Sequence, residues 1–363
     1  MKTQLRETTT RTLSYARIQA DDRATRAAQG LRVLSNSAQA LASCRTDEAG
    51  DVPATDTITP LKPNRPWPPR DRVPMFDNGR RLSAALITPT FRLDLERCEL
   101  LVESVRRCAP SLAHYLIVDK CDLSVFRHLE GPMTRVVVSA SLLPAGFRRL
   151  PIGKPIWVGP RLTRTRGWIV QQVLKIAIAE HVTEDILIFC DSDLCFVRPF
   201  DVEQVVSSGS VHLLDVDYNS DEVSRWTNVA AQLLALDDTI EARGHVGNVI
   251  CWRRENVLAL VADLSKESDR DWRYRLLSLP TVSEYILYGV YVRSVLGYPA
   301  SGQHPSTVPF AKASWGADLS STEGMDEFFA SFDPATVAVM VHSKDGVAVA
   351  SYRDRVEAMW PVA

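Results

Sequence analysis

The chain has 363 residues, and its 42 Lys and Arg residues nearly balance its 44 Asp and Glu residues, giving a formal net charge of −2. Apolar residues make up 45 % and charged residues 24 %, which is ordinary for a globular protein. The near-neutral balance disfavours binding to nucleic acid, because phosphate backbones require a basic surface. No apolar run approaches the ~20 residues of a membrane-spanning helix, although the sequence leaves room for peripheral contact with a membrane.

The N-terminus and the cysteines indicate the compartment in which we expect the protein to work. The N-terminal residues lack the apolar stretch of a secretory signal. The 7 cysteines are scattered and include no close Cys-x-x-Cys pair, which favours reduced thiols over a disulfide framework or a zinc site. We therefore expect a cytoplasmic protein.

Residues 1–80 differ in composition from the rest of the chain. Residues 45–80 are dense in Pro, Asp and Arg and poor in aliphatic side chains, so they bury too little apolar surface to offset the entropy lost on ordering. Residues 12–43 are compatible with a helix. The sequence predicts a partly disordered extension over 1–80 and a single folded domain over 81–363.

From residue 82 onward, short apolar strands alternate with amphipathic helices. The expected strands cover residues 83–88, 115–118, 135–139, 185–190, 211–214, 248–252 and 337–341. The expected helices cover residues 95–109, 166–181, 222–236, 254–264 and 282–296. This alternation predicts an α/β fold with a doubly wound, mostly parallel central sheet and flanking helices. In such a fold, ligands bind beyond the carboxyl ends of the strands.

Two carboxylates, Asp191 and Asp193, follow directly after the segment 185–190, whose apolar run is typical of a strand in the middle of a sheet. Carboxylates one residue apart can converge on one cation, and hard divalent cations choose oxygen ligands. A cation held there would grip a diphosphate and stabilise the charge that develops when a nucleoside diphosphate leaves. The alternative is a D-x-D that merely forms a solvated turn.

Gln171 and Lys175 are four residues apart on a predicted helix, so their side chains share one face. An ammonium group aimed at the diphosphate would supplement the charge of the cation. The alternative is a solvated polar face opposite the apolar face of the same helix.

The ordered set of segments resembles glycosyltransferases of the GT-A fold, and more specifically a little-described bacterial family known only as glycosyltransferase-like. The matching segments are LITPTFRLDLERCELLVESV (86–105), HYLIVD (114–119), RGWIVQQVLKIAIAE (166–180), DILIFCDSDLCFVRPFD (185–201), GNVICWRREN (247–256) and SEYILYGVYV (283–292). The resemblance implies a single GT-A-like catalytic domain and a metal-dependent glycosyltransferase. Such an enzyme moves a sugar from a nucleotide-sugar donor to a hydroxyl acceptor, here an unknown glycan or small molecule, with Mn²⁺ or Mg²⁺ as cofactor.

The resemblance also implies roles for single residues. Thr88 and Pro89 match the place where this fold contacts the nucleoside, and Asp119 matches the acidic residue that meets the base or ribose. Asp191 would face the ribose or the metal, and Asp193 would ligate the metal. As alternatives, Pro89 only ends a strand and Asp119 only forms a turn.

His342 and Glu284 complete the implied site. His342 follows the last predicted strand, where many enzymes of this fold take a further metal ligand, although its spacing alone favours a surface histidine. If the transfer inverts the anomeric centre, a carboxylate must take the acceptor's proton, and Glu284 is the candidate catalytic residue, with Asp215 or Asp217 as alternatives. Thr281-x-x-Glu284 also fits a helix capping box, in which Glu284 only starts a helix.

Two other functions fit the same carboxylates. Haloacid-dehalogenase-like phosphatases carry a D-x-D after an apolar strand, with the residue at Asp191 as nucleophile and the residue at Asp193 as acid/base. Their motif usually lies near the start of the domain and is followed by Thr or Val where this chain has Cys195, so we rank this function second. A non-catalytic nucleotide-sugar-binding module is the third, and it predicts binding without turnover.

Overall fold

A computed structural model of the chain describes residues 82–150, 156–160, 164–236, 240–266, 270–315 and 317–361. The chain divides into two compact units, Met1–Ile58 with Arg149–Ile156, and Thr59–Arg148 with Trp157–Ala363. The extension predicted over residues 1–80, with its helix, lies outside the described residues. The site described below lies in the second unit.

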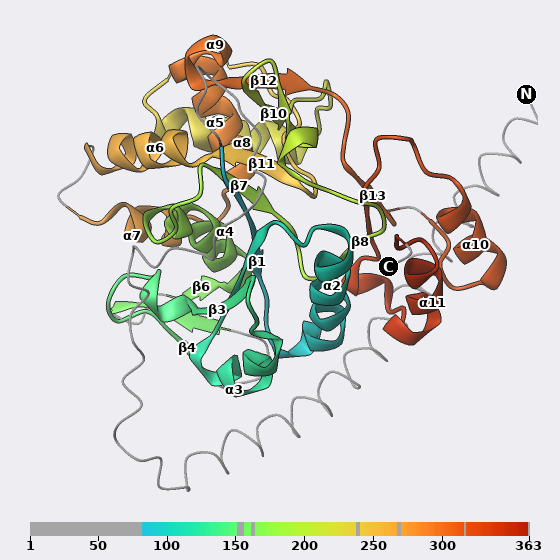
Figure 1. Cartoon of the computed structure of the whole chain (residues 1–363). Coiled ribbons are helices and arrows are strands. Elements are labelled where there is room, and N and C mark those ends of the chain that lie inside the picture. Colours follow the sequence, from blue (N-terminus) through green and yellow to red (C-terminus); the bar gives the residue numbers. More distant parts are fainter. Residues whose placement is uncertain are drawn as a thin grey trace, which may run out of the picture. The chain divides into compact units, whose positions relative to one another are not determined.

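The central sheet has five strands in the order β11–β7–β1–β2–β3 (Figure 1). Strands β1 (Ala84–Pro89), β2 (Ala113–Val118), β3 (Thr134–Val138) and β7 (Ile186–Phe189) pair in parallel, and β11 (Ile250–Arg253) pairs antiparallel with β7. Every residue of β1, β2 and β7 is buried, which is typical of a parallel sheet covered on both faces. The predicted α/β fold with a mostly parallel central sheet is confirmed.

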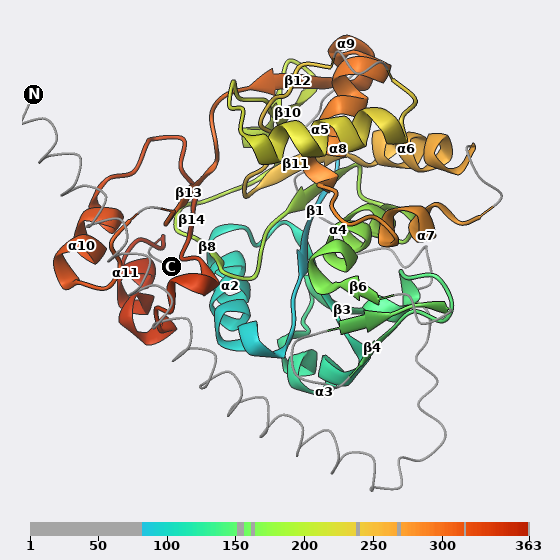
Figure 2. The same ribbon diagram turned by 180° about the vertical axis from the view of Figure 1, so that it is seen from behind.

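Helices lie on both faces of the central sheet (Figures 1 and 2), and neighbouring residues of β7 belong to different cores. Phe189 of β7 belongs to a core that includes residues of α4 (Gly167–Ala177). Ile188, the residue before it, belongs to a second core with residues of α2 (Leu95–Cys108). Successive side chains of a strand point to opposite faces, so the apolar run of β7 is explained by helices on both sides.

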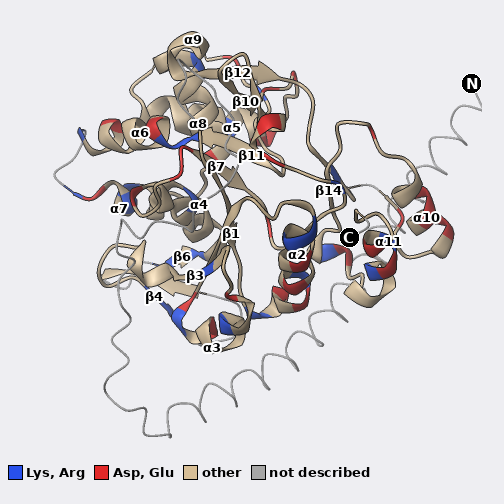
Figure 3. Ribbon diagram, in the orientation of Figure 1, with Lys and Arg blue, Asp and Glu red and all other residues tan. Residues whose placement is uncertain are grey.

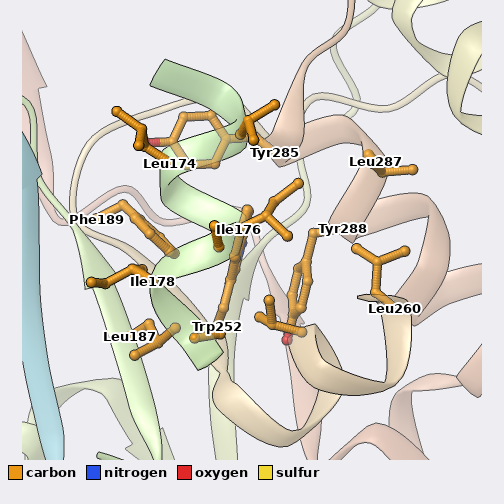
Figure 4. Close-up of a cluster of buried hydrophobic side chains, with 14 of the residues drawn as sticks. Leu174, Ile176, Ile178, Leu187, Phe189, Trp252, Leu260, Tyr285, Leu287 and Tyr288 are labelled. Carbon is orange, nitrogen blue, oxygen red and sulfur yellow. The ribbon is translucent and has the colours of Figure 1, made fainter. Parts of the chain in front are cut away.

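Aromatic side chains fix α8 (Glu284–Val290) against the sheet (Figure 4). The ring of Trp252, from β11, lies 4.5 Å from that of Phe189 and 4.3 Å from that of Tyr288, in a stacked arrangement with Tyr288. Tyr285 lies edge-on to Phe189 at 6.3 Å. Fully buried rings of this size dominate the packing energy of a core. The first residue of α8 is therefore held at a fixed place beside the central sheet.

The predicted helices of the described chain are present, with shifted ends. In chain order, the remaining helices are α3 (Leu123–Phe126), α5 (Asp221–Leu233), α6 (Arg254–Lys266), α7 (Trp272–Leu277), α9 (Tyr298–Ser301), α10 (Thr322–Ala330) and α11 (Arg353–Glu357). The helix predicted over 282–296 begins at Glu284 as α8, and its second half, Tyr291–Leu296, is a π-helix. This π-helix ends at Gly297, whose φ of 75° suits glycine.

Two predicted strands lie outside the central sheet, in small sheets of three strands. Strand β10 (Ser210–Leu214) lies between β9 (Val206–Ser207) and β12 (Gln303–Ser306). Strand β14 (Ala338–Met340) lies between β13 (Ala311–Ala313) and β8 (Leu194–Phe196). The other short strands are β4 (Arg148–Leu150), β5 (Ile156–Val158) and β6 (Arg164–Arg166).

The described cysteines other than Cys121 are buried free thiols, as expected for reduced core thiols. Within the described ranges, no helix combines the length and the apolar character needed to cross a membrane.

Candidate active site at the carboxyl edge of the central sheet

The acidic loop Asp191–Asp193 lies at the carboxyl end of β7, between β7 and β8. Its turn is closed by the Leu194 amide, which donates to the Asp191 carbonyl at 3.1 Å. The Asp191 side chain is 36 % exposed, whereas Asp193 is only 7 % exposed. The loop therefore presents one accessible and one buried carboxylate at the edge of the sheet where α/β folds bind ligands.

Lys175 reaches this loop from α4, and its ammonium group contacts three side chains. Its Nζ lies 3.2 Å from Asp191 Oδ1 and 3.1 Å from Glu284 Oε1, and it donates to the Tyr285 hydroxyl at 2.8 Å. The same ammonium lies 4.5 Å from the centroid of the Tyr285 ring, a cation–π distance. Lys175 is the only charged residue of α4, which is otherwise tan in Figure 3. The sequence-predicted Lys175 is thus brought to the loop, held in a single position.

The charges in this cluster are set by burial and by each other. Burial alone lowers the pKa of Lys175, but its three partners outweigh that effect and raise the pKa well above its usual value. Burial raises the pKa of Glu284, and the Lys175 ammonium opposes that rise. Glu284 is 1 % exposed, and its Oε2 accepts no hydrogen bond from the described residues. The cluster therefore places a permanent positive charge beside the acidic loop.

The capping box proposed as the alternative for Glu284 is absent, although Glu284 does begin a helix as that alternative expected. The N-cap of α8 is Ser283, whose side chain accepts from the Ile286 amide, and Glu284 is the first residue of the helix. The hydroxyl of Thr281 instead accepts from the indole Nε1 of Trp226 at 2.9 Å. The backbone amide of Glu284 donates to Gln172 Oε1 at 3.1 Å, which leaves its carboxylate directed at Lys175.

Asp193 is fastened by the C-terminal strand β14. Met340 pairs with Leu194 in the antiparallel ladder, and the Val341 amide donates to the Asp193 carbonyl at 3.2 Å. The Ser343 amide donates to Asp193 Oδ2 at 2.8 Å, whereas Oδ1 is buried with no partner among the described residues. This register also brings His342 next to Asp193. Burial raises the pKa of Asp193, the Asp191 charge adds to the rise, and His342 opposes it.

The structure adds one carboxylate that the sequence prediction did not include. Asp94 ends a short 3-10 helix after β1, and its Oδ2 accepts from the Ser192 hydroxyl at 3.3 Å. Burial raises the pKa of Asp94 to about 6, and the charge of Asp193 contributes to the rise. The sequence does hold a signal that could have identified Asp94. It lies shortly after a predicted central strand, within the segment 86–105.

Replacing Asp94 by Asn is expected to stabilise the chain at pH 7. The folded chain keeps a proton on Asp94 up to about pH 6, whereas the unfolded chain releases it near ~3.9, so stability falls as the pH rises through this window. In chelator, Asp94→Asn should raise the free energy of unfolding by about 3 kcal/mol at pH 7, and the gain should vanish below about pH 4. Urea unfolding across this range measures it, with the exposed Asp217→Asn as the control. A gain that does not change with pH would contradict the assignment.

The carboxylates at this edge match the donor chemistry of a hard divalent cation. Asp191, Asp193 and Asp94 offer oxygen ligands, and the buried Asp193 Oδ1 lacks any other partner within the described ranges. Among those residues, no three His, Cys, Asp or Glu side chains already converge as a complete ligand set. The residues thus fit part of a coordination shell, with the remaining places left to water or a diphosphate.

The predicted nucleoside contacts lie on the neighbouring strands. Thr88 is fully buried, and its hydroxyl is 3.0 Å from Nε2 of His114, whose pKa burial lowers to about 3. Pro89 is also buried and ends β1. Asp119, half-buried after β2, accepts from the Cys121 amide at 3.0 Å and from the Ser139 hydroxyl at 3.5 Å. Asp119 therefore does form the turn that the alternative predicted, at the same edge as the acidic loop.

Three further candidates lie apart from the Lys175 cluster. Gln171 is half-buried on α4. Asp215 is paired with Arg243 and Tyr298; burial raises its pKa, but these hydrogen bonds outweigh burial and lower it. Asp217 is exposed. A carboxylate already paired with an arginine is a weak base, so Asp215 is disfavoured as the general base.

Asn248 approaches the acidic loop from β11. Ile250 pairs with Phe189 in the antiparallel ladder, so Asn248, two residues earlier, reaches the same edge as Asp191. Its Nδ2 lies 2.9 Å from Met340 Sδ, and its Oδ1 is buried with no partner among the described residues. Three strands, β7, β11 and β14, therefore converge on this loop.

A family model described as a family of unknown function, DUF6492, matches residues 82–357. Solved structures similar to this chain include the galactosyltransferase LgtC in complex with donor and acceptor sugar analogues, at 12 % identity and a TM-score of 0.40, covering 77 % of this chain and 97 % of that one. The bifunctional glycosyltransferase WbbM matches at 10 % identity and a TM-score of 0.43, covering 78 % of this chain and 50 % of that one. Mouse xyloside xylosyltransferase 1 matches at 10 % identity and a TM-score of 0.39, covering 74 % and 100 %. No curated protein matches the sequence.

Proposed function

We propose that this chain, which belongs to the DUF6492 family of unknown function, is a metal-dependent glycosyltransferase that moves a sugar from a nucleotide-sugar donor to a hydroxyl acceptor. The main support for the proposal is the ion pair between the buried Lys175 ammonium and Asp191. It lies in the acidic loop Asp191–Asp193 at the carboxyl edge of the central sheet. The sequence resemblance supports the same chemistry.

Asp191, Asp193 and His342 would hold the divalent cation, which supplies positive charge to the leaving diphosphate. The buried Asp193 Oδ1 has no other partner among the described residues, and His342, two residues past the end of β14, lies close enough for its charge to lower the pKa of Asp193. Lys175 contributes a second positive charge that needs no reorganisation when the sugar–phosphate bond breaks. Thr88, Pro89 and Asp119 belong to the strand ends where we place the nucleoside.

Glu284 has a positioning role in this proposal. A general base must come within hydrogen-bond reach of the proton that it takes. Glu284 is 1 % exposed and lies 3.1 Å from the Lys175 ammonium, so its carboxylate is turned to Lys175 and away from solvent. We propose that it fixes Lys175 against Asp191.

Thermal unfolding with UDP or GDP tests the proposal. We expect either diphosphate to raise the melting temperature when Mn²⁺ or Mg²⁺ is present and to have little effect in chelator, because binding to the folded state alone stabilises it. A panel of nucleotide sugars with Mn²⁺ should then reveal donor hydrolysis. If no diphosphate shifts the melting temperature with metal, the proposal fails.

The same preparation separates the two other functions. Hydrolysis of p-nitrophenyl phosphate, with a fluoride complex trapped on Asp191, would identify a phosphatase in place of a transferase. A metal-dependent shift without turnover of any nucleotide sugar would identify a binding module.

A further inference from the structure

The first turn of α4 carries an exposed indole that lies against a second one. Trp168 is 41 % exposed, and its ring centroid lies 5.8 Å from that of Trp226 in α5, at an interplanar angle of 35°. Trp226 packs on the main core and donates its Nε1 to the Thr281 hydroxyl at 2.9 Å. Trp226 is therefore fixed in place, and Trp168 adds an accessible aromatic face to it.

This indole pair belongs to the same helix face as the Lys175 cluster. Trp168 and Lys175 are two helical turns apart, which corresponds to about 10 Å of rise. Because α4 leads toward the start of β7, its first turn projects beyond the carboxyl edge at which Lys175 meets Asp191. Gln172 connects the two places, since it donates to the Trp168 carbonyl at 3.2 Å and accepts from the Glu284 amide at 3.1 Å.

The surroundings of the indole pair are polar. Gln171 is half-buried three residues after Trp168, about one helical turn along α4, and Glu222, one turn before Trp226 on α5, is exposed. A sugar ring has an apolar face of C–H groups and a rim of hydroxyls, which suits a flat aromatic surface with an amide and a carboxylate beside it. A lipid chain on the same surface would bury those polar groups without partners, which is unfavourable.

We propose that Trp168 and Trp226 form the acceptor subsite, in which one sugar ring of a glycan stacks on the exposed indole and its hydroxyls bond to Gln171 and Glu222. This inference rests on the proposed function, and it identifies the acceptor as a glycan rather than a small molecule without a sugar ring. Two helical turns of α4 separate this acceptor subsite from Lys175, which belongs to the end of the site proposed to bind the diphosphate.

An array of immobilised oligosaccharides, probed with the full chain, UDP and Mn²⁺, tests this subsite. Trp168→Ala should weaken binding to the recognised glycans by about tenfold or more, and Trp168→Phe should restore part of it. The matched control is Phe329→Ala, because Phe329 is a half-buried aromatic residue of α10 whose ring lies 6.3 Å from that of Phe332, and α10 carries none of the residues placed in the site. Phe329→Ala should leave glycan binding unchanged.

The stabilisation of each variant by UDP or GDP with Mn²⁺ separates failure of the subsite from failure of the proposed function. Trp168→Ala should keep the full diphosphate-dependent shift. The subsite is overturned if the original chain shows that shift but binds none of the glycans, or if Trp168→Ala binds them as well as the original chain does. It is also overturned if Trp168→Ala lowers only binding to phosphatidylglycerol vesicles, which would mark a membrane contact. Loss of the shift in the original chain would instead contradict the proposed function.

Discussion

Replacing Lys175 by Met is expected to lower the free energy of unfolding by about 3–5 kcal/mol, the loss typical of breaking a buried ion pair. The Lys175 side chain is 3 % exposed and that of Glu284 is 1 % exposed, so the substitution leaves a buried carboxylate without its counter-charge. Urea unfolding at pH 7 measures the effect. The same variant should also lose donor hydrolysis, because the diphosphate loses a fixed positive charge.

The pH dependence gives this prediction a second readout. Burial already raises the pKa of Glu284, and removal of Lys175 should raise it further. A carboxylate whose folded pKa lies above its unfolded value binds a proton more readily in the folded chain, so stability is lost as the pH rises. The deficit of Lys175→Met should therefore shrink as the pH is lowered, when Glu284 becomes neutral.

Two variants serve as controls for Lys175→Met. Lys266 is 73 % exposed and paired with Asp263, and Lys266→Met should change stability by no more than about 0.5 kcal/mol. Adding Glu284→Gln to Lys175→Met should recover part of the loss, because the uncompensated charge is gone. If Lys175→Met lowered the free energy of unfolding no more than Lys266→Met does, the buried ion pairs of Lys175 would not stabilise the site.

Asp193→Asn is expected to abolish the metal-dependent stabilisation by UDP or GDP and to lower donor hydrolysis by about 100-fold or more. An asparagine keeps an oxygen to accept from the Ser343 amide, so the fold should persist, but it loses the negative charge that would hold the cation. Calorimetric titration with Mn²⁺ provides a readout that does not depend on turnover.

The exposed Asp354→Asn, on α11, is the matched control for Asp193→Asn, since it removes one carboxylate outside the site. It should retain both the metal-dependent shift and the hydrolysis. An Asp193→Asn chain that still binds Mn²⁺ as tightly as the original would remove Asp193 from the proposed coordination shell.

The centre of the site could be predicted from sequence because its signals are local. The apolar run of β7 allowed only a covered, central strand, so the carboxylates after it had to lie at the ligand edge of the sheet. Lys175 was found by the same kind of reasoning, since helical spacing fixes which side chains share a face. The structure places Lys175 beside Asp191, and its contact with a diphosphate stays a prediction.

What the sequence left open depends on contacts between distant segments. Nothing in the pattern around Asp94 indicates a hydrogen bond to Ser192, and Thr281 and Ser283 are equally good caps by residue type. Alternation of side chains reveals which residues face the core but not which strand is the neighbour. For that reason, the strands now seen as β10 and β14 could not be assigned to separate sheets.

The hydrogen bond from the Ser343 amide to the Asp193 carboxylate connects positions 150 residues apart in the chain. During translation, the five-stranded sheet can assemble while the segment that carries β14 is still inside the ribosome, because the N-terminal part of a nascent chain folds first. The arrival of that late strand then delivers His342 and the Ser343 amide together. Nascent chains that still lack residues 338–343 would carry Asp193 without this hydrogen bond, so the proposed cation site would form only after β14 has been added.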